Sequence, residues 1–324
     1  MAKRPTRPTR PAAPAPVSWR DGVHLTGTPI WCDARRRRDV CFVSSADRVG
    51  RSSHGQLIGT PITLALVAQD AGHLAVPVHR PFTLGTLRLE LIPSGRCLGA
   101  AALHVDAGTG TVLYAGAIRT VAERAAAEVR SCDALVVAAP YGEAHHRFAR
   151  LDDIATQVIA WVRRQLAGHR TPVLVVDTPL DGIEVAQRLA GEDLVIAGSR
   201  AIRDTLLRIT SLAPGLQSLQ IRAPGGREPT VIIRVEGERI KPPENARTAV
   251  ALVSGRALDL VQHGYENGFP WPFVAGRDEL LNWIEQARAK EIFVTGPSAE
   301  TIVAKLGSRA RVLGPPRQMA LFAP

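Results

Sequence analysis

The chain lacks any long apolar segment. Among its 324 residues there is no run of about 18 apolar residues, so the sequence predicts no membrane-spanning helix. The basic N-terminus is not followed by an apolar stretch, so a secretory signal is not expected. We therefore expect a cytoplasmic protein without a membrane partner.

Sequence signatures of several common sites are also missing. Only four cysteines occur and no two form a CxxC pair, which argues against a zinc ribbon or a dithiol redox site. The sequence holds neither a GxxxxGK[ST] loop nor a GxSxG turn. It therefore shows no phosphate-binding loop of the nucleotide-hydrolase type and no nucleophilic serine of the α/β-hydrolase type.

Acidic residues are absent from the first 20 positions, which carry five of the ten excess positive charges of the chain. The segment "MAKRPTRPTRPAAPAPV" has few residues that could pack in a core, and its prolines cannot donate hydrogen bonds. Residues 1–18 are thus expected to form a disordered basic arm. Its Arg4, Arg7 and Arg10 would neutralise phosphates of DNA or RNA, or the arm would only aid solubility.

Apolar periodicity predicts an α/β fold for the rest of the chain. Short strand patterns dominate up to about residue 142, with a turn at 106–110 and helices expected at 60–72 and 120–131. A helical pattern over 151–166 then opens a regular alternation of strands and helices. Such alternation is typical of a parallel sheet covered by helices.

Several short patterns occur in a recognisable order. They are "CFVSSADRVGRSSH", "PSGRCLGAAAL", "VLYAGAIR", "DALVVAAPYG", "FVAGRDELL" and "EIFVTG". In this order they resemble the HxHxDH, GHxxGS, YxGD, ExTYG, SDHADxxELL and VTHG segments of metallo-β-lactamase-fold nucleases with a β-CASP insertion. That family includes pre-mRNA 3′-end processing factors and a bacterial DNA-ligase-associated exonuclease.

The resemblance covers residues 20–313 and implies an αββα metallo-β-lactamase sandwich with an inserted β-CASP α/β domain. It divides the chain into a basic arm, an N-terminal sandwich part, a β-CASP-like insertion, a C-terminal sandwich part and a flexible tail. The corresponding ranges are 1–18, 19–145, 146–246, 247–313 and 314–324.

Enzymes of this family hold two zinc ions through histidines and aspartates, and the ions activate a water molecule. At the matching positions this chain carries residues that cannot bind a cation: Arg96, Ala117, Ala138, Val274 and Gly296. A guanidinium stays protonated and offers no lone pair. We therefore expect neither a metal site nor a catalytic residue, and interpret the chain as a degenerate nuclease homologue.

Two groups of arginines are candidate phosphate contacts. Arg96 and Arg48 would bind phosphate at the former metal position, or would instead pair with Asp33 and Asp47. The run "DARRRRD" places Arg35, Arg36, Arg37 and Arg38 on a loop, either as phosphate contacts or as a solvated turn.

The C-terminal "RQMALF" resembles the QLxLF peptide with which bacterial repair and replication proteins bind the DNA sliding clamp. Gln318 would make polar contacts, and Met319, Leu321 and Phe322 would supply the apolar anchors. The alternative is an apolar tail that folds back on its own domain.

The leading hypothesis is a non-catalytic binding subunit associated with DNA repair or replication. Its partners would be DNA or RNA, the sliding clamp, and an active paralogous nuclease or a DNA ligase. The enzyme alternative is a metal-dependent exonuclease or phosphoesterase with two zinc ions on a rebuilt site, using Asp33, Asp47, His54 and Asp177. A third alternative is a structural partner that never touches nucleic acid.

The adjacent His145 and His146 are expected to point to opposite faces and to hold no metal together.

Overall fold

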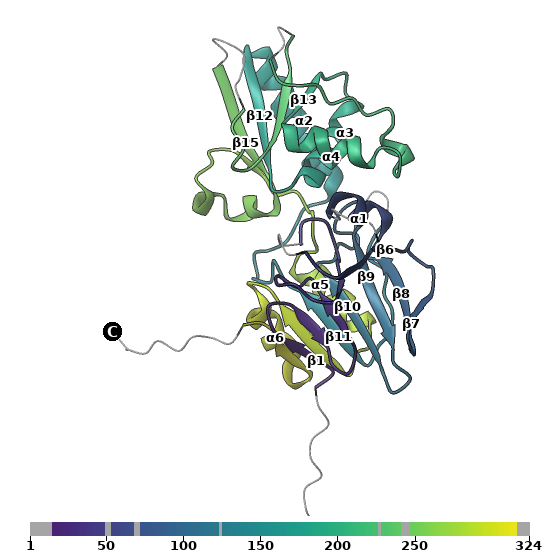
Figure 1. Cartoon of the computed structure of the whole chain (residues 1–324). Coiled ribbons are helices and arrows are strands. Elements are labelled where there is room, and N and C mark those ends of the chain that lie inside the picture. Colours follow the sequence, from purple (N-terminus) through teal and green to yellow (C-terminus); the bar gives the residue numbers. More distant parts are fainter. Residues whose placement is uncertain are drawn as a thin grey trace, which may run out of the picture.

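The described residues form two units, each with its own core (Figure 1). The computed structural model describes residues 15–48, 53–67, 72–122, 125–225, 228–240 and 247–315. We call the described residues from 15 to 145 together with those from 270 to 313 the two-sheet unit. The described residues from 151 to 269 form the insert unit.

The first sheet of the two-sheet unit has six strands in sequential order. Its first three strands are antiparallel, and the remaining ones join in parallel. The strands are β1 (Val17–Trp19), β2 (Val23–Leu25), β3 (Ile30–Cys32), β4 (Val40–Phe42), β5 (Gln56–Gly59) and β6 (Leu74–Ala75).

The second sheet has seven strands in the order β18-β17-β11-β10-β9-β8-β7. Strands β7 to β10 form an antiparallel meander, and β11, β17 and β18 add to it in parallel. Because β17 and β18 follow the insert unit in the sequence, the chain returns to this sheet after that unit. The strands are β7 (Phe82–Leu84), β8 (Leu87–Pro93), β9 (Ala101–Asp106), β10 (Thr111–Gly116), β11 (Ala134–Ala138), β17 (Glu291–Thr295) and β18 (Ala310–Val312).

The two sheets pack face to face, because alternate residues of their short strands are apolar. Leu25 and Phe42 of the first sheet share one buried cluster with Leu91 and Leu103 of the second. The outer face of the first sheet is covered by α1 (Pro61–Val67). The outer face of the second is covered by α5 (Arg277–Gln286) and α6 (Ala299–Leu306), followed by η3 (Gly307–Arg309). The layers therefore run helix, sheet, sheet, helix.

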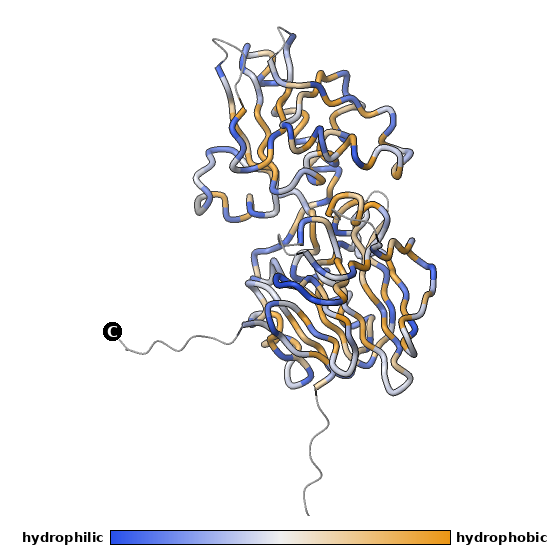
Figure 2. The backbone as a smooth tube through the Cα atoms, viewed as in Figure 1, coloured by the Kyte–Doolittle hydropathy of each residue, from blue (hydrophilic) through white to orange (hydrophobic). Residues whose placement is uncertain are grey.

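The insert unit is a five-stranded parallel sheet in the order β13-β14-β12-β15-β16. Successive residues of β12 are buried in clusters on its two faces, as expected for a parallel strand covered on both sides. Figure 2 shows hydrophobic stretches of backbone in both units. The strands are β12 (Arg170–Val176), β13 (Ile196–Gly198), β14 (Val231–Val235), β15 (Arg247–Val253) and β16 (Gly268–Phe269). The helices are α2 (Leu151–Ala167), α3 (Pro179–Ala190), α4 (Arg200–Ile209), η1 (Pro214–Leu216) and η2 (Gly255–His263). The predicted α/β class is confirmed.

The insert unit ends later than the sequence predicted. The expected boundary lay at residue 246, but β15 pairs with β12 from Arg170↔Arg247 to Val175↔Leu252. Ala251 and Val253 of β15 are buried in the core of the insert unit. The chain therefore leaves this unit only after Phe269, which ends β16, the last strand to pair with β15.

The helix expected at 120–131 is absent from the described part of that segment, which comprises 120–122 and 125–131. Its alanines favour a helix, but the Ala127 N–H donates to the Arg119 carbonyl at 2.8 Å and the Glu128 N–H to the Pro93 carbonyl at 3.0 Å. Long-range backbone pairing has overridden local propensity here. Elsewhere in the described ranges, no helix is long and apolar enough to cross a membrane.

Candidate functional site

Two sets of predicted residues lie outside the described part of the chain. They are Arg4, Arg7 and Arg10 of the arm, and Gln318, Met319, Leu321 and Phe322 of the clamp-binding-like peptide. Their proposed roles remain predictions.

The positions that hold zinc in the resembling family come together at one edge of the second sheet. Ala117 directly follows β10, Ala138 ends β11, and Gly296 directly follows β17. These three strands are parallel neighbours, so their carboxyl ends share one edge. Val274 reaches the same place from the segment before α5, and it forms one buried cluster with Ala117 and Ala138. Three of the positions taken from the resemblance thus lie in one cluster.

The side chains at this edge do not fit a metal ion. Ala117, Ala138 and Val274 are 4%, 7% and 7% exposed, and none of them carries a lone pair. Tyr141 packs against the cluster. Burial, followed by the charge of Asp177, raises the pKa of Tyr141 to about 12, so its hydroxyl is neutral. The edge is an apolar cluster within the two-sheet unit rather than a ligand set.

Arg96 is presented by a sharp loop between β8 and β9. Gly95 precedes it with a φ of +73°, and a Cβ at this glycine would lie 2.2 Å from the Arg119 carbonyl oxygen. Only glycine tolerates both the left-handed backbone and that close approach. The loop therefore fixes where the Arg96 side chain begins and brings the backbone of Arg119 beside it.

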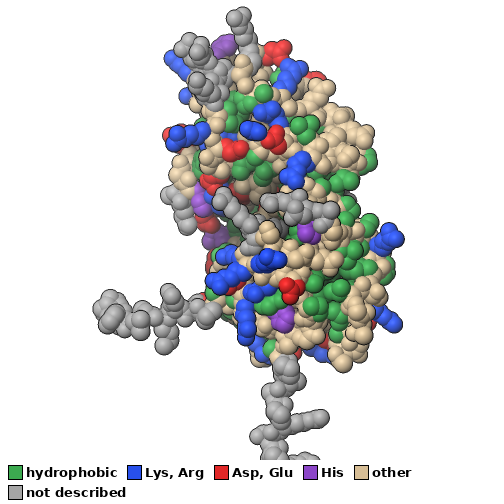
Figure 3. Space-filling model, in the orientation of Figure 1, with side chains coloured by type: hydrophobic (Ala, Val, Ile, Leu, Met, Phe, Trp, Pro, Cys, Tyr) green, Lys and Arg blue, Asp and Glu red, His purple; other side chains and the backbone are tan. Residues whose placement is uncertain are grey.

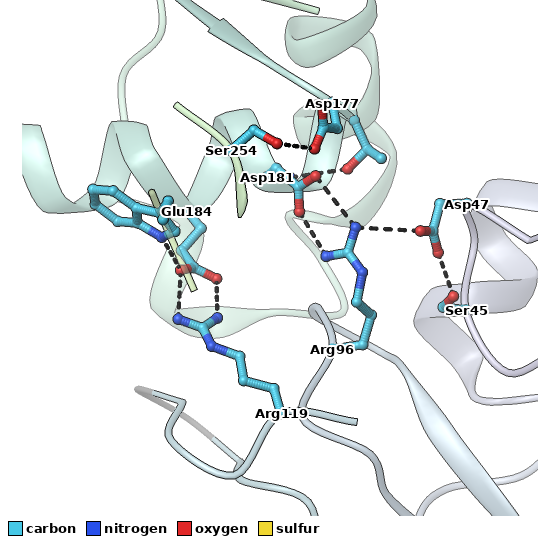
Figure 4. A network of polar contacts seen from close by, with 10 residues as sticks. Ser45, Asp47, Arg96, Arg119, Asp177, Asp181, Glu184 and Ser254 are labelled. Atoms are coloured by element: carbon cyan, nitrogen blue, oxygen red, sulfur yellow. Dashed lines mark hydrogen bonds and ion pairs between the residues drawn. The ribbon is translucent and has the colours of Figure 1, made fainter. Parts of the chain in front are cut away.

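Arg96 is buried and pairs with carboxylates from both units (Figure 4). Its Nη1 lies 2.7 Å from Asp181 Oδ1 on α3, and its Nη2 lies 3.3 Å from both Asp181 Oδ2 and Asp47 Oδ2. Asp47 also accepts from the Ser45 hydroxyl. Burial opposes the charge, but Asp181 and Asp47 outweigh it and raise the pKa of Arg96 well above its ordinary value.

The geometry favours one of the two readings that the sequence left open for Arg96. Pairing with Asp47 is observed, whereas pairing with Asp33 is not among the contacts of the described residues. Asp33 instead accepts from the Ser44 N–H at 2.8 Å, the Ser44 hydroxyl at 2.6 Å and the Tyr114 hydroxyl at 2.8 Å. Its carboxylate therefore ties the end of β3 to β10 across the two sheets.

A second arginine of the two-sheet unit pairs with the next turn of α3. Arg119 is 2% exposed, and its Nη1 and Nη2 lie 2.8 and 3.0 Å from the two carboxylate oxygens of Glu184. Glu184 Oε1 also accepts from Trp271 Nε1 at 2.8 Å. Asp181 and Glu184 are three residues apart, so they share one face of α3. We call Arg96–Asp181 and Arg119–Glu184 the two-arginine bridge.

Sequence reasoning missed this bridge. The only local signal at Asp181 is its place three residues after Thr178, and Thr178 Oγ1 does accept from the Asp181 N–H at 3.2 Å as the N-cap of α3. That pattern indicates a helix start and not an ion pair. The partner arginine lies 85 positions away, so only the tertiary fold identifies it.

The bridge changes the interpretation of Arg96 as a nucleic-acid contact. Both of its Nη atoms face protein carboxylates, and the side chain is only 9% exposed. A phosphate would have to displace the buried carboxylate of Asp181 and the partly exposed one of Asp47 to reach it. Arg96 is therefore withdrawn from the candidate phosphate contacts.

The arginine loop between β3 and β4 is on the surface but partly engaged. Arg38 stacks over Trp31 at 3.7 Å and donates to the Arg20 carbonyl at 2.6 Å. Arg36 lies 3.1 Å from an oxygen of Asp21. Arg35, Arg36, Arg37 and Arg48 are exposed, and Figure 3 shows cationic side chains on this face of the two-sheet unit. Both readings of the loop, phosphate contact and solvated turn, remain open.

His145 and His146 do not point to opposite faces, because the chain turns at 143–147. Their rings are 4.2 Å apart, and their Nε2 atoms lie 2.9 and 3.1 Å from the two oxygens of Asp259. Within the described ranges this is the only group of three such ligand atoms. By residue type, these three side chains could ligate one metal ion.

The hydrogen bonds of this group do not favour a metal. His146 Nδ1 accepts from the Gly142 N–H at 3.1 Å and the Glu143 N–H at 3.0 Å, so the ring proton lies on Nε2 and is donated to Asp259. That nitrogen then has no lone pair for a cation. Hydrogen bonding from His146 is the largest cause of the lowered pKa of Asp259.

The four ligands of the enzyme alternative are not brought together. Asp33 and Asp47 have the partners described above, and His54 Nδ1 accepts from the Arg38 N–H at 3.2 Å. Asp177 binds the Ser254 hydroxyl at 2.5 Å and Arg256 Nε at 3.0 Å. No three of the four form a ligand group in the part of the chain that the structure describes.

Comparisons with known proteins identify a similar fold but assign no function. No protein-family profile matches the chain, and no curated protein is similar to it in sequence at a significant level. Among solved structures the chain is similar to a protein of unknown function from Enterococcus faecalis V583, with a TM-score of 0.55 and 11% sequence identity. The match covers 86% of this chain and 80% of that one. At this identity the likeness supports the fold alone.

Proposed function

We propose that the protein is a catalytically degenerate relative of the metallo-β-lactamase-fold nucleases with a β-CASP insertion, and that it acts as a binding subunit in DNA repair or replication. The helix–sheet–sheet–helix layers and the inserted parallel sheet support this family. The observation that carries the proposal is the apolar cluster of Ala117, Ala138 and Val274.

Binding without cleavage is the activity this arrangement favours. Hydrolysis of a phosphodiester by this fold depends on cations that polarise phosphate and activate water. The edge where those cations would sit supplies alkyl side chains, and the nearby guanidinium of Arg96 is held by Asp181 and Asp47. The exposed arginines Arg35–Arg37 and the basic arm would contact nucleic acid at another surface.

The proposed partners follow from charge and from the tail peptide. DNA or RNA would be held by the arm and the arginine loop, and the bacterial sliding clamp by residues 318–322. A paralogous active nuclease or a DNA ligase is the direct protein partner in this proposal. Such a role places the protein in the cytoplasm, without a membrane partner.

The proposal predicts nucleic-acid binding without cleavage. Purified protein should contain far less than one zinc per chain and should leave single- and double-stranded DNA and RNA intact with or without added zinc. It should nevertheless bind these strands. Elemental analysis, a cleavage assay and salt-dependent binding measure the three properties on one preparation.

The sequence placed the end of the arm at residue 18, but Val17 is buried in β1, so deletion of residues 1–14 provides the control for binding. The arm carries Lys3, Arg4, Arg7 and Arg10, so its loss should reduce the magnitude of the slope of log K against log salt by about 3 to 4 for duplex DNA. Two tightly bound zinc ions per chain together with cleavage would instead support the exonuclease or phosphoesterase alternative. An unchanged slope would favour a structural partner that does not use its arm on nucleic acid.

The tail peptide predicts a separate interaction. Changing Leu321 and Phe322 to alanine removes both apolar anchors and should weaken binding to a bacterial sliding clamp by at least about 100-fold. Surface plasmon resonance with immobilised clamp measures the loss. An Ala323→Gly variant, at the neighbouring position outside the motif, should bind as the wild type does. Equal affinity of all three proteins would remove the clamp from the list of partners.

A further inference from the structure

Trp31 points to the outer face of the first sheet. Ile30 and Cys32 on either side of it are fully buried between the two sheets, so the alternation of β3 directs the Trp31 side chain away from them. The indole is half-buried and packs against the cluster that contains Leu57 and Leu64. A half-buried indole beside exposed arginines is a feature of surfaces that stack nucleic-acid bases.

The two faces of this indole are covered by different groups. His24 is the cross-strand neighbour of Trp31, and its ring stacks on the indole with a centroid distance of 4.5 Å and an interplanar angle of 27°. His24 Nε2 lies 2.9 Å from the Thr28 carbonyl oxygen, which holds the imidazole in place. The guanidinium carbon of Arg38 lies 3.7 Å from the indole centroid. Imidazole and guanidinium are both too close to the indole to share one face, so the indole lies between them.

Arg38 is the more easily displaced of the two groups. Its Nη2 donates to the Arg20 carbonyl at an exposed position, but its Nε is buried and has no acceptor among the described residues. A buried donor without an acceptor is unfavourable, so movement of the guanidinium to water or to a phosphate would satisfy Nε. An exposed cation–π contact is worth about two- to fivefold in an equilibrium constant, whereas a base stacked on an aromatic ring is worth roughly 5- to 150-fold. A base would therefore replace the guanidinium on the indole.

We propose that Trp31 is a stacking site for one base of a single-stranded nucleic acid, and that Arg38 covers the indole in the free protein and moves to a phosphate when the base binds. This inference rests on the proposed nucleic-acid role and specifies a single strand as the ligand, because the bases of a duplex are already stacked on each other. The exposed Arg35–Arg37 lie next to Arg38 in the chain and supply phosphate contacts for the neighbouring nucleotides.

Three strands of equal length and charge test the ligand: oligothymidylate, oligouridylate, and an abasic chain of deoxyribose phosphates. Fluorescence anisotropy should show that the protein binds oligothymidylate, oligouridylate or both at least about fivefold more tightly than the abasic chain, because only a base can stack on Trp31. Equal affinity for all three strands would overturn the stacking site and leave the proposed binding role in place. Absence of binding to all three would overturn the proposed function and this inference with it.

The Trp31→Leu variant tests the location of the stacked base. It should bind the base-bearing strands no more tightly than the abasic chain. Its affinity for the abasic chain and for a duplex should stay within about twofold of the wild type, because phosphate contacts do not involve the indole. A preference for base-bearing strands that survives in the folded variant would place the stacking elsewhere and overturn the assignment to Trp31.

The Arg38→Ala variant tests the movement of the guanidinium and does not require that Trp31→Leu fold. The magnitude of the slope of log K against log salt should fall by about 0.7 for the preferred base-bearing strand, because one phosphate contact is lost. It should not change for the abasic chain, which has no base to displace Arg38. The matched control Arg88→Ala, at an exposed position of β8, should leave both slopes unchanged. Equal slopes of Arg38→Ala and the wild type on the base-bearing strand would mean that Arg38 stays on the indole, and would overturn the exchange.

Discussion

Replacing Arg96 with alanine is expected to destabilise the protein by about 3–5 kcal/mol. The substitution leaves Asp181, a 1% exposed carboxyl, without its bidentate partner. Breaking a buried pair from one side is costly, because the remaining charge keeps its desolvation penalty and loses its counter-ion. Urea unfolding followed by circular dichroism measures the change, with each transition fitted separately if the two units unfold apart.

The pH dependence of the Arg96→Ala variant should identify the orphaned group. Burial already raises the pKa of Asp181, although Arg96 opposes this shift. Without Arg96 the folded protein keeps a proton on Asp181 that the unfolded chain releases near pH 4. The folded state then binds more protons, so the free energy of unfolding of the variant should fall as pH rises from about 4 towards 7.

Two control variants separate the buried pair from a general effect of losing an arginine. Arg200 pairs with Asp204 on the surface of α4, with side chains 86% and 54% exposed, and Arg200→Ala should cost less than about 0.5 kcal/mol. The double variant Arg96→Met with Asp181→Leu should recover much of the loss, because no buried charge remains. A loss below about 1 kcal/mol for Arg96→Ala would show that the bridge does not hold the units together.

Introducing a carboxylate at Ala117 should be the second large effect. The resembling family has its bridging aspartate at this position, whereas here the neighbours are Ala138, Val274 and Tyr141. A buried carboxyl with no cationic partner among them should destabilise Ala117→Asp by at least about 3 kcal/mol. Added zinc should give no recovery, because the remaining positions offer no ligand set.

The near-isosteric Ala117→Asn variant separates charge from size. It should be less destabilised than Ala117→Asp at neutral pH, and the difference should shrink as the aspartate is protonated. Thermal unfolding with and without zinc measures both variants. A zinc-dependent rise in the melting temperature of Ala117→Asp would mean that ligand-bearing side chains do surround this position, and the non-catalytic interpretation would fail.

Many helices, strands and turns of this fold could be predicted from the sequence, because the spacing of apolar residues along the chain indicates them. The turn predicted at 106–110 lies between β9 and β10, and the helix predicted over 151–166 from a 3.6-residue period is α2 (Leu151–Ala167). The segment 120–131 shows where this fails. Its alanine-rich composition predicts a helix, but pairing with the Arg119 and Pro93 carbonyls holds residues 127 and 128 in another conformation.

The site divides in the same way. The sequence by itself determined that positions 117, 138 and 274 carry alkyl side chains. Such side chains have no lone pair and cannot bind a metal ion in any fold. Only the tertiary structure decided that Arg96 meets Asp181 and that Arg119 meets Glu184, across 85 and 65 positions. Ion pairs between residues so far apart in the sequence form only because the two units pack against each other in one arrangement. No local pattern of residues indicates that arrangement.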